Sequence, residues 1–164
     1  MPKRNAGASG KSGGKVIGVP FEPKGELLLR RTFDAPRELV FKVWTDPKHV
    51  AEWWGPRGFK TTIHEMNVRP GGRWYYSMRA PDGKDYVFDG VYLDVAEPER
   101  LIFDGSIHGL PEQRVWTEVT FVESEGKTEI IVRQLFSFES DATRGAKIGW
   151  NQQMDRLSEF LASF

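Results

Sequence analysis

The chain has 164 residues and no cysteine, and its 23 basic and 23 acidic side chains give a formal net charge of zero. This length predicts one domain with a real core, and the lack of cysteine excludes disulfides, thiolate metal sites and a cysteine nucleophile. The balanced charge argues against a general nucleic-acid binder or anionic-membrane binder, because both depend on a basic excess.

The first part of the chain differs in composition from the rest. Residues 1–24 are rich in Gly, Ser and Lys, and five of them are basic while only Glu22 is acidic. Such a segment buries too little apolar surface to offset the entropy of ordering it, so we expect a disordered tail over 1–24 and one domain over 25–164. The apolar run Val16–Phe21 is too short for a secretion signal, and no later run is long enough to enter a membrane, so we expect a cytoplasmic protein.

The expected domain starts with a strand and two short helices. Glu26–Phe33 predicts the strand. Asp34–Pro36 supplies an N-cap and a first-turn proline for a helix whose apolar residues follow over Leu39–Trp44. Asp46-Pro47 repeats this start signal, and Gly55-Pro56 ends the second helix.

The middle of the chain consists of strand-like segments. Turn residues recur roughly every 8–12 residues, a spacing typical of an antiparallel meander. In Arg69–Gly72, Pro and then Gly occupy the two central positions that a type II turn requires. The six expected strands are Lys60–Val68, Arg73–Arg79, Asp85–Val95, Leu101–Ile107, Arg114–Val122 and Thr128–Phe138.

One long amphipathic helix closes the chain. Its apolar residues recur at steps of four and three from Ala146 to Phe164, and Ser140 or Asp141 can cap its start. It is the one expected element large enough to cover a face of the sheet. We therefore predict an α+β fold in which a curved antiparallel sheet of about seven strands wraps around the long C-terminal helix, with two short helices after strand one.

Six short motifs, in this order, resemble those of the START-like (SRPBCC, birch-pollen-allergen-like) superfamily with its helix-grip fold. They are Arg31–Pro36, Val43–Pro47, Trp53–Pro56, Arg69–Gly72, Asp94–Leu101 and Gly149–Leu157. The resemblance covers about residues 26–164 and is closest to the group homologous to the C-terminal domain of the activator of the 90-kDa heat-shock chaperone's ATPase. The superfamily implies many functions on one scaffold and gives no universal catalytic residue.

Three functions are compatible with this resemblance. The first is binding of a small hydrophobic or aromatic ligand, such as a lipid, in a cavity between the sheet and the C-terminal helix. The alternative is a stress-response interaction module whose partner is a chaperone. A second alternative is a cyclase- or hydrolase-type enzyme that uses the same cavity. No cofactor, metal or nucleic-acid partner is expected in any of the three.

Aromatic residues, 13% of the chain, provide the expected cavity wall. Alternation along the strands places many of them on one face, opposite the apolar stripe of the last helix. A one-residue slip would exchange the faces, and only then would Arg73, Glu118 or Arg133 point inward as an acid or base. The expected ligand-cavity residues are Trp54, Phe59, Trp74, Tyr76, Phe88, Tyr92, Phe103, Val119, Phe121, Trp150, Met154 and Leu157.

Two motifs leave alternatives open. Trp53 and Trp54 are adjacent in a helix and cannot face the same way, so Trp54 either packs in the core or gates the cavity mouth. Gly145 and Gly149 each cost the last helix about 1 kcal/mol relative to Ala. Either the helix approaches the sheet closely at these two positions, or they leave room for a ligand beside Trp150.

The three histidines do not predict a site. His49, His64 and His108 form no spaced ligand pair, and without cysteine a transition metal would need ligands gathered from scattered strands. We therefore expect them to be solvated or hydrogen-bonded, and we predict no catalytic residue.

Overall fold

A computed structural model of the chain describes residues 18–139 and 141–164. In this part of the chain, seven antiparallel strands form one sheet in the order β2-β8-β7-β6-β5-β4-β3. The elements are β2 (Gly25–Phe33), α1 (Arg37–Thr45), α2 (Pro47–Trp53), β3 (Lys60–Met66), β4 (Arg73–Arg79), β5 (Asp85–Ala96), β6 (Arg100–Ile107), β7 (Arg114–Ser124), β8 (Lys127–Phe136) and α3 (Asp141–Ala162). The predicted helix-grip α+β fold is confirmed, and strand ends differ from those expected by at most two residues.

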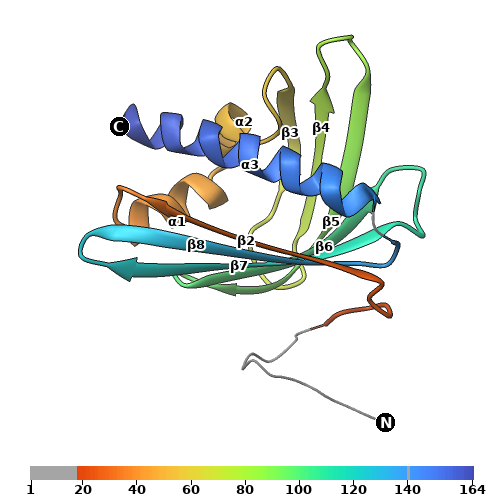
Figure 1. Cartoon of the computed structure of the whole chain (residues 1–164), viewed down its shortest axis with the longest axis horizontal. Helices are drawn as coiled ribbons and strands as arrows, with labels where there is room; N and C mark the ends of the chain where they lie inside the picture. The colour runs from red at the N-terminus through yellow and green to blue at the C-terminus, as the bar shows by residue number, and fades with distance from the viewer. Residues whose placement is uncertain (1–17, 140) are drawn as a thin grey trace.

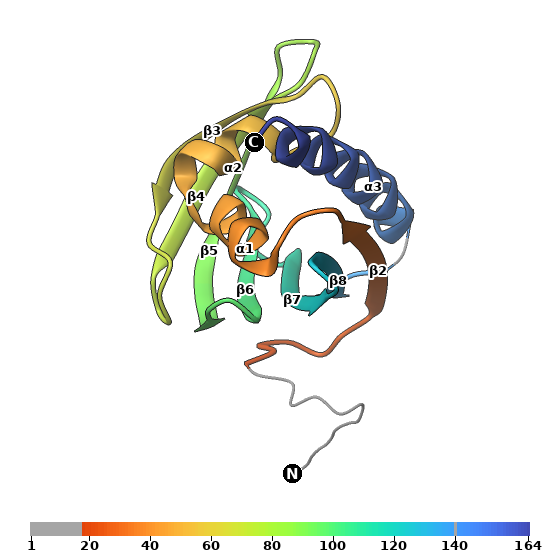
Figure 2. The same cartoon turned by 90° about the vertical axis from the view of Figure 1, so that its left-hand side faces the viewer.

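The sheet is strongly curved, and all three helices of the described residues lie on its concave side. Figure 1 shows α3 running across the strands, and Figure 2 shows the sheet bending around it with α1 and α2 near the C-terminal end of α3. An antiparallel sheet needs only one covered face, so inward and outward residues alternate. In β2, for example, Leu27, Leu29 and Phe33 are buried while Leu28 is exposed.

The two short helices start differently. Asp46 caps α2 as predicted, because its carboxylate accepts a hydrogen bond from the backbone N–H of Lys48 at 3.0 Å. The prediction that Asp34–Pro36 supplies a capping side chain for α1 is wrong, because Pro36 itself occupies the cap position and no side chain bonds to the first turn. Helix α1 is instead held by its buried face, which includes Val40 and Trp44.

Two further local predictions concern a turn and a helix start. The type II turn is confirmed, since Gly71 has a φ of 83° and the N–H of Gly72 donates to the carbonyl of Arg69 at 2.8 Å. The predicted cap of α3, the side chain of Ser140 or Asp141, lies outside the described residues.

Part of the expected tail packs on the convex face of the sheet. Val19 and Phe21 lie against a small buried cluster on that face, and the N–H of Lys24 donates to the carbonyl of Phe136 at 2.8 Å. The cluster consists of Ile102, Trp116 and Leu135. The tail prediction therefore does not extend to residues 18–24, because this apolar patch binds them, and residues 1–17 lie outside the described residues.

The main core fills the concave side at the end where α1 and α2 lie. It joins side chains from β2, β6, β7 and β8 to the buried faces of all three helices, and Trp53 and Val40 are completely buried in it. Within the described ranges, no helix is long and apolar enough to cross a lipid bilayer.

Candidate functional site

A cavity of about 370 Å³ lies between the concave face of the sheet and the first half of α3. Its volume is more than twice the roughly 150 Å³ of an engineered apolar cavity that binds benzene. Its wall is formed by Trp54, Pro56, Trp74, Tyr76, Met78, Phe88, Phe103, Gly105, Ser106, Ile107, Gln113, Val115, Thr117, Gln134, Phe136, Phe138, Gly145, Ala146, Gly149, Trp150 and Gln153.

A smaller pocket of about 50 Å³ adjoins this cavity on the side of α2 and β3. The two spaces share four aromatic wall residues, so these rings form the partition between them. The shared residues are Trp54, Trp74, Tyr76 and Phe103.

The twelve residues expected to line a cavity separate into four groups. Six of them line the larger cavity, and Tyr92 lines the smaller pocket. Phe59 lies outside both walls, with its ring 6.3 Å from that of Tyr86. The six on the wall of the larger cavity are Trp54, Trp74, Tyr76, Phe88, Phe103 and Trp150.

The other four expected residues, Val119, Phe121, Met154 and Leu157, belong to the packed core and are at most 1% exposed. The reason is the placement of α3. Its first half, from Gly145 to Gln153, faces the cavity, whereas its second half fills the space above the sheet with its own side chains.

The adjacent tryptophans have separate roles. Trp53 is fully buried and donates a hydrogen bond from Nε1 to the carbonyl of Val43 at 2.9 Å, which makes it part of the core. Trp54 is half-buried, and its ring centroid lies 5.5 Å from that of Trp150 and 5.9 Å from that of Tyr76. Of the two, only Trp54 contacts the cavity.

The loop that carries Trp54 is attached to α3 by Arg156. The guanidinium of Arg156 donates to the carbonyl oxygens of Trp54 at 3.1 Å, Gly55 at 2.9 Å and Glu52 at 3.1 Å. Burial lowers the pKa of Arg156, whereas the carbonyl oxygens around its guanidinium stabilise the charged form. This arginine fixes the position of the loop relative to the cavity.

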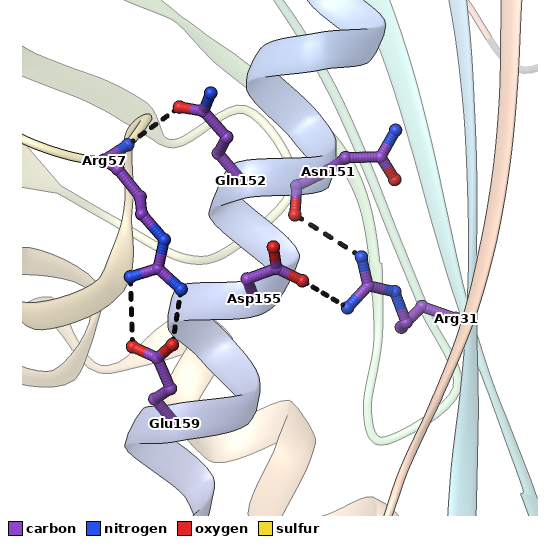
Figure 3. A network of polar contacts seen from close by, with 6 residues as sticks. All are labelled: Arg31, Arg57, Asn151, Gln152, Asp155 and Glu159. Atoms are coloured by element: carbon purple, nitrogen blue, oxygen red, sulfur yellow. Dashed lines mark hydrogen bonds and ion pairs between the residues drawn. The ribbon is translucent and has the colours of Figure 1, made fainter.

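A second set of contacts holds the same loop from its outer side (Figure 3). The backbone N–H of Arg57 donates to Oε1 of Gln152 at 3.1 Å, and its guanidinium forms a bidentate ion pair with Glu159. On the opposite side of α3, Arg31 of β2 donates to Asp155 at 2.8 Å. These exposed pairs tie α3 to the loop and to the edge strand.

A pair of glycines makes room for one cavity wall. Gly90 of β5 and Gly105 of β6 are cross-strand partners, and the indole of Trp74 lies over both of them. A Cβ at Gly105 would stand 2.3 Å from Cζ2 of Trp74, and one at Gly90 would stand 1.9 Å from the carbonyl of Asp104. Glycine is therefore required at both positions for this ring to lie flat against the sheet.

The two glycines of α3 are not explained by close packing. Apart from its chain neighbours and the helix backbone, a Cβ at Gly145 would have no atom of the described residues within 4 Å, and one at Gly149 would meet only Cγ of Pro56 at 3.8 Å, an ordinary contact. Both glycines line the cavity. Of the two explanations that the sequence leaves open, these distances oppose a close approach of the helix to the sheet; Gly145 is exposed to solvent, and Gly149 is half-buried beside the cavity.

A buried hydrogen-bonded strip crosses the cavity wall, and sequence reasoning missed it. Nε1 of Trp150 donates to Oε1 of Gln134 at 2.9 Å, and Nε2 of Gln134 donates to Oγ1 of Thr117 at 3.0 Å. One turn beyond Trp150, Oε1 of Gln153 accepts the N–H of Gly55 at 2.8 Å. Burial also raises the pKa of the Tyr76 hydroxyl, which keeps it neutral on the wall.

No register slip turns the candidate acid–base residues inward. Arg73 lies on the exposed side, paired with Glu65 at 2.9 Å, and Arg133 pairs with Glu26 at 3.1 Å. Glu118 lies between Thr117 and Val119, whose side chains face the concave side, so its carboxyl group points to the convex side. None of these three residues belongs to the described cavity wall.

The histidines lie apart from the cavity. The ring of His49 lies tilted beside those of Phe160 and Phe164, and Nε2 of His64 lies 3.0 Å from Oγ of Ser77 on the exposed face. Among the residues that the structure describes, no group of three or more His, Asp or Glu side chains is arranged to hold a metal ion.

Comparisons with known proteins agree on one family and one fold. The model of the family described as Activator of Hsp90 ATPase homolog 1-like protein matches residues 34–162. A Chromobacterium violaceum protein of known structure has 25% identity and a TM-score of 0.76, over 82% of this chain and 94% of the other. A Silicibacter pomeroyi protein of the same family has 21% identity and a TM-score of 0.74, over 84% and 98%. No curated protein matches the sequence.

Proposed function

Because this chain belongs to the family of Activator of Hsp90 ATPase homolog 1-like proteins, and its helix-grip fold leaves a half-open cavity between the sheet and α3, we propose that it binds a small hydrophobic or aromatic molecule in that cavity. The observation that carries the proposal is the unfilled space of about 370 Å³ beside Trp150. Concave, mostly apolar surfaces of this kind are the usual sites for small ligands. A bound apolar ligand would remove the aromatic rings of this wall from water.

The geometry of the wall suits a flat ligand. The rings of Tyr76, Trp74 and Phe88 lie in one row, with Tyr76 stacked at 5.5 Å on Trp74 and at 5.2 Å on Phe88. An aromatic ligand can pack parallel to this row, while the edge of Trp54 contacts it from the side. A lipid chain would fit the same apolar wall with fewer ring contacts.

The test is a titration with N-phenyl-1-naphthylamine, an uncharged dye whose fluorescence rises in apolar surroundings. We expect saturable binding by the unaltered protein and a loss of at least tenfold in affinity for Gly149→Leu, because the added side chain occupies the cavity mouth. Ser158→Leu is the matched control, since it adds the same side chain at an exposed position of α3. Equal dye affinity in the two variants would contradict the proposal.

The family match favours a second candidate function, a stress-response module that binds a chaperone. The test is the ATPase rate of a purified 90-kDa heat-shock chaperone with and without this protein. An unchanged rate at tens of micromolar, together with no complex in analytical ultracentrifugation, would exclude this function.

We do not propose an enzymatic reaction, because Arg73, Glu118 and Arg133 lie off the described wall of the cavity. A cytoplasmic location stays a prediction from the sequence.

A further inference from the structure

The described wall of the larger cavity carries no charged side chain. Its polar side chains are amides, hydroxyls and indole N–H groups. An ion that entered this space would leave water without meeting a counter-charge, which is strongly unfavourable. The wall therefore selects for ligands without a net charge.

The orientation of the Gln153 amide follows from its partner. A backbone N–H can only donate, so the atom that accepts the N–H of Gly55 at 2.8 Å must be the oxygen of the amide. The NH₂ group is thereby directed elsewhere, and no acceptor for it is found among the described residues. Gln153 is only 6% exposed and lines the cavity, so its NH₂ is a donor that a ligand in the cavity can reach.

The same reasoning fixes the amide of Gln134. An indole N–H can only donate, so Oε1 of Gln134 is the atom that accepts from Trp150 at 2.9 Å. One hydrogen of the NH₂ group bonds to Oγ1 of Thr117, and the second has no partner in the described part of the chain. The Thr117 oxygen already accepts this bond, which leaves its own O–H free to donate.

A third donor on the wall is fully buried and unpaired. Nε1 of Trp74, on the opposite part of the wall, is buried and has no partner among the described residues. The half-buried Ser106 and Gln113 can reach water, whereas Gln134 and Gln153 are at most 7% exposed. The deep wall thus offers several N–H and O–H groups for which the described residues supply no acceptor, although among them only Nε1 of Trp74 is both fully buried and unpaired.

We infer that the cavity selects an uncharged aromatic ligand that carries an acceptor oxygen, such as an aryl ketone, and holds that oxygen with the free donors of Gln134 and Gln153. The inference rests on the proposed ligand-binding function. A hydrocarbon of the same shape would leave the donors unsatisfied, and a carboxylate would bring a buried charge with no cation on the wall.

Three naphthalene probes separate these cases. They are 2-acetylnaphthalene, 2-ethylnaphthalene and 2-naphthoate, which share one ring system and differ in the acceptor and the charge. Isothermal titration calorimetry gives the dissociation constants, and the ketone preference is defined as the constant for the ethyl compound divided by that for the acetyl compound. Because the ethyl compound is the more hydrophobic, the preference is compared between protein variants and not judged by its absolute value.

The informative variant is Gln153→Glu. An ionised carboxylate still accepts the N–H of Gly55, and Arg156 one turn away favours the ionised form, but the donor to the ligand is gone. We expect the ketone preference to fall about tenfold, the effect of one donor that loses its acceptor. Gln134→Glu should lower it in the same way, because a carboxylate accepts from both Trp150 and Thr117.

The matched control is Gln152→Glu, the same chemical change at the neighbouring position. Gln152 lies on the outer side of α3, where it accepts the N–H of Arg57 (Figure 3), and it is not part of the cavity wall. Its ketone preference should equal that of the unaltered protein. If a variant fails to fold, the unaltered protein can be used instead, with 2-acetylnaphthalene labelled with ¹³C at its carbonyl carbon. A hydrogen bond donated to the carbonyl oxygen raises the chemical shift of this carbon above its value in cyclohexane, so a raised shift in the complex shows that the protein donates to the ketone.

The outcomes distinguish the inference from the proposed function. An unchanged ketone preference in Gln153→Glu and Gln134→Glu, a cyclohexane-like carbonyl shift, or tighter binding of 2-naphthoate than of the ketone overturns the inference alone. Failure of both the acetyl and the ethyl compound to bind overturns the proposed function, and the inference falls with it.

Discussion

Replacing the two cavity glycines of α3 with alanine should stabilise the protein. Glycine in a helix interior is disfavoured relative to alanine by about 0.5–1 kcal/mol, because its unfolded backbone has more freedom to lose. A substitution realises this gain only where the new methyl group meets no close contact. Apart from chain neighbours and the helix backbone, no atom of the described residues lies within 4 Å of a Cβ added at Gly145, and at Gly149 the nearest is Cγ of Pro56 at 3.8 Å.

The two positions are neighbours on one helix face, but each gain comes from the unfolded backbone of its own residue and the two methyl groups have no common contact, so the gains should add. We expect Gly145→Ala and Gly149→Ala each to raise the free energy of unfolding by about 0.5–1 kcal/mol, and the double variant by about 1–2 kcal/mol. For a chain of this size, 1 kcal/mol corresponds to a rise in melting temperature of about 2–4 °C.

The assay is urea unfolding followed by tryptophan fluorescence, with an unchanged m-value as the sign that the same surface is exposed. Gly105→Ala is the contrasting variant, because its Cβ would lie 2.3 Å from the ring of Trp74, and it should lose several kcal/mol. If Gly145→Ala or Gly149→Ala destabilises the protein, the helix does approach the sheet there and the reasoning about free space is refuted.

Three further predictions concern other contacts. Arg156→Met should lower the free energy of unfolding by about 2 kcal/mol in urea titrations, because buried loop carbonyls lose their donor, and a neutral result would contradict the role assigned to this arginine. Burial raises the pKa of Glu118, so the folded state binds its proton more tightly than the unfolded state, and stability falls as pH rises through the interval above the ordinary glutamate pKa. Glu118→Gln should therefore gain stability over the unaltered protein at pH 7 and lose that advantage near pH 4 in thermal melts; a pH-independent difference would oppose this. Phe21→Ser should speed proteolysis within residues 18–24, because the convex-face cluster loses its cover, and unchanged cleavage would show that Phe21 does not hold the segment.

Local signals in the sequence predicted most of the architecture. Turn residues marked the strands, Asp46 marked the start of α2, and alternation placed Trp74 and Tyr76 on the concave face. These features depend on neighbours within a few residues, which is the range over which periodicity and capping carry information. Val19 and Phe21 were expected in a disordered tail because local patterns do not reveal distant partners, and their partners lie on strands far along the chain.

The depth at which a side chain is buried was harder to predict than the face of the helix or strand on which it lies. Trp150, Met154 and Leu157 lie on one stripe of α3, yet only Trp150 lines the cavity while the other two are sealed in the core. Helical periodicity gives the direction of a side chain but not the distance to what lies opposite. That distance depends on the curvature of the sheet, which no local pattern encodes.

The buried amides left a signal in the sequence that could have been used. Gln134 interrupts an apolar face of β8 that includes Ile130 and Val132, and Gln153 stands beside Met154 on the buried side of α3. An amide at such a position is unfavourable unless its groups are hydrogen-bonded. Two amides that interrupt apolar faces on elements lying opposite each other therefore indicate a shared polar region. The sequence does not show which of the amide hydrogens stay without an acceptor.

The cavity brings together features that each reduce stability. Gly145 and Gly149 weaken the helix, and the amides of Gln134 and Gln153, at most 7% exposed, carry hydrogens for which the described residues supply no acceptor. A domain under selection for folding alone would gain from Ala or Leu at these positions, and such stabilising changes are usually easy to find. Because all four residues line one space, a common cause is more economical than four separate ones, and a ligand that fills the space and accepts the free hydrogens provides it. The glycine-to-alanine variants then have a second expected property: as they gain stability, they should bind the naphthalene ketone no better than the unaltered protein does.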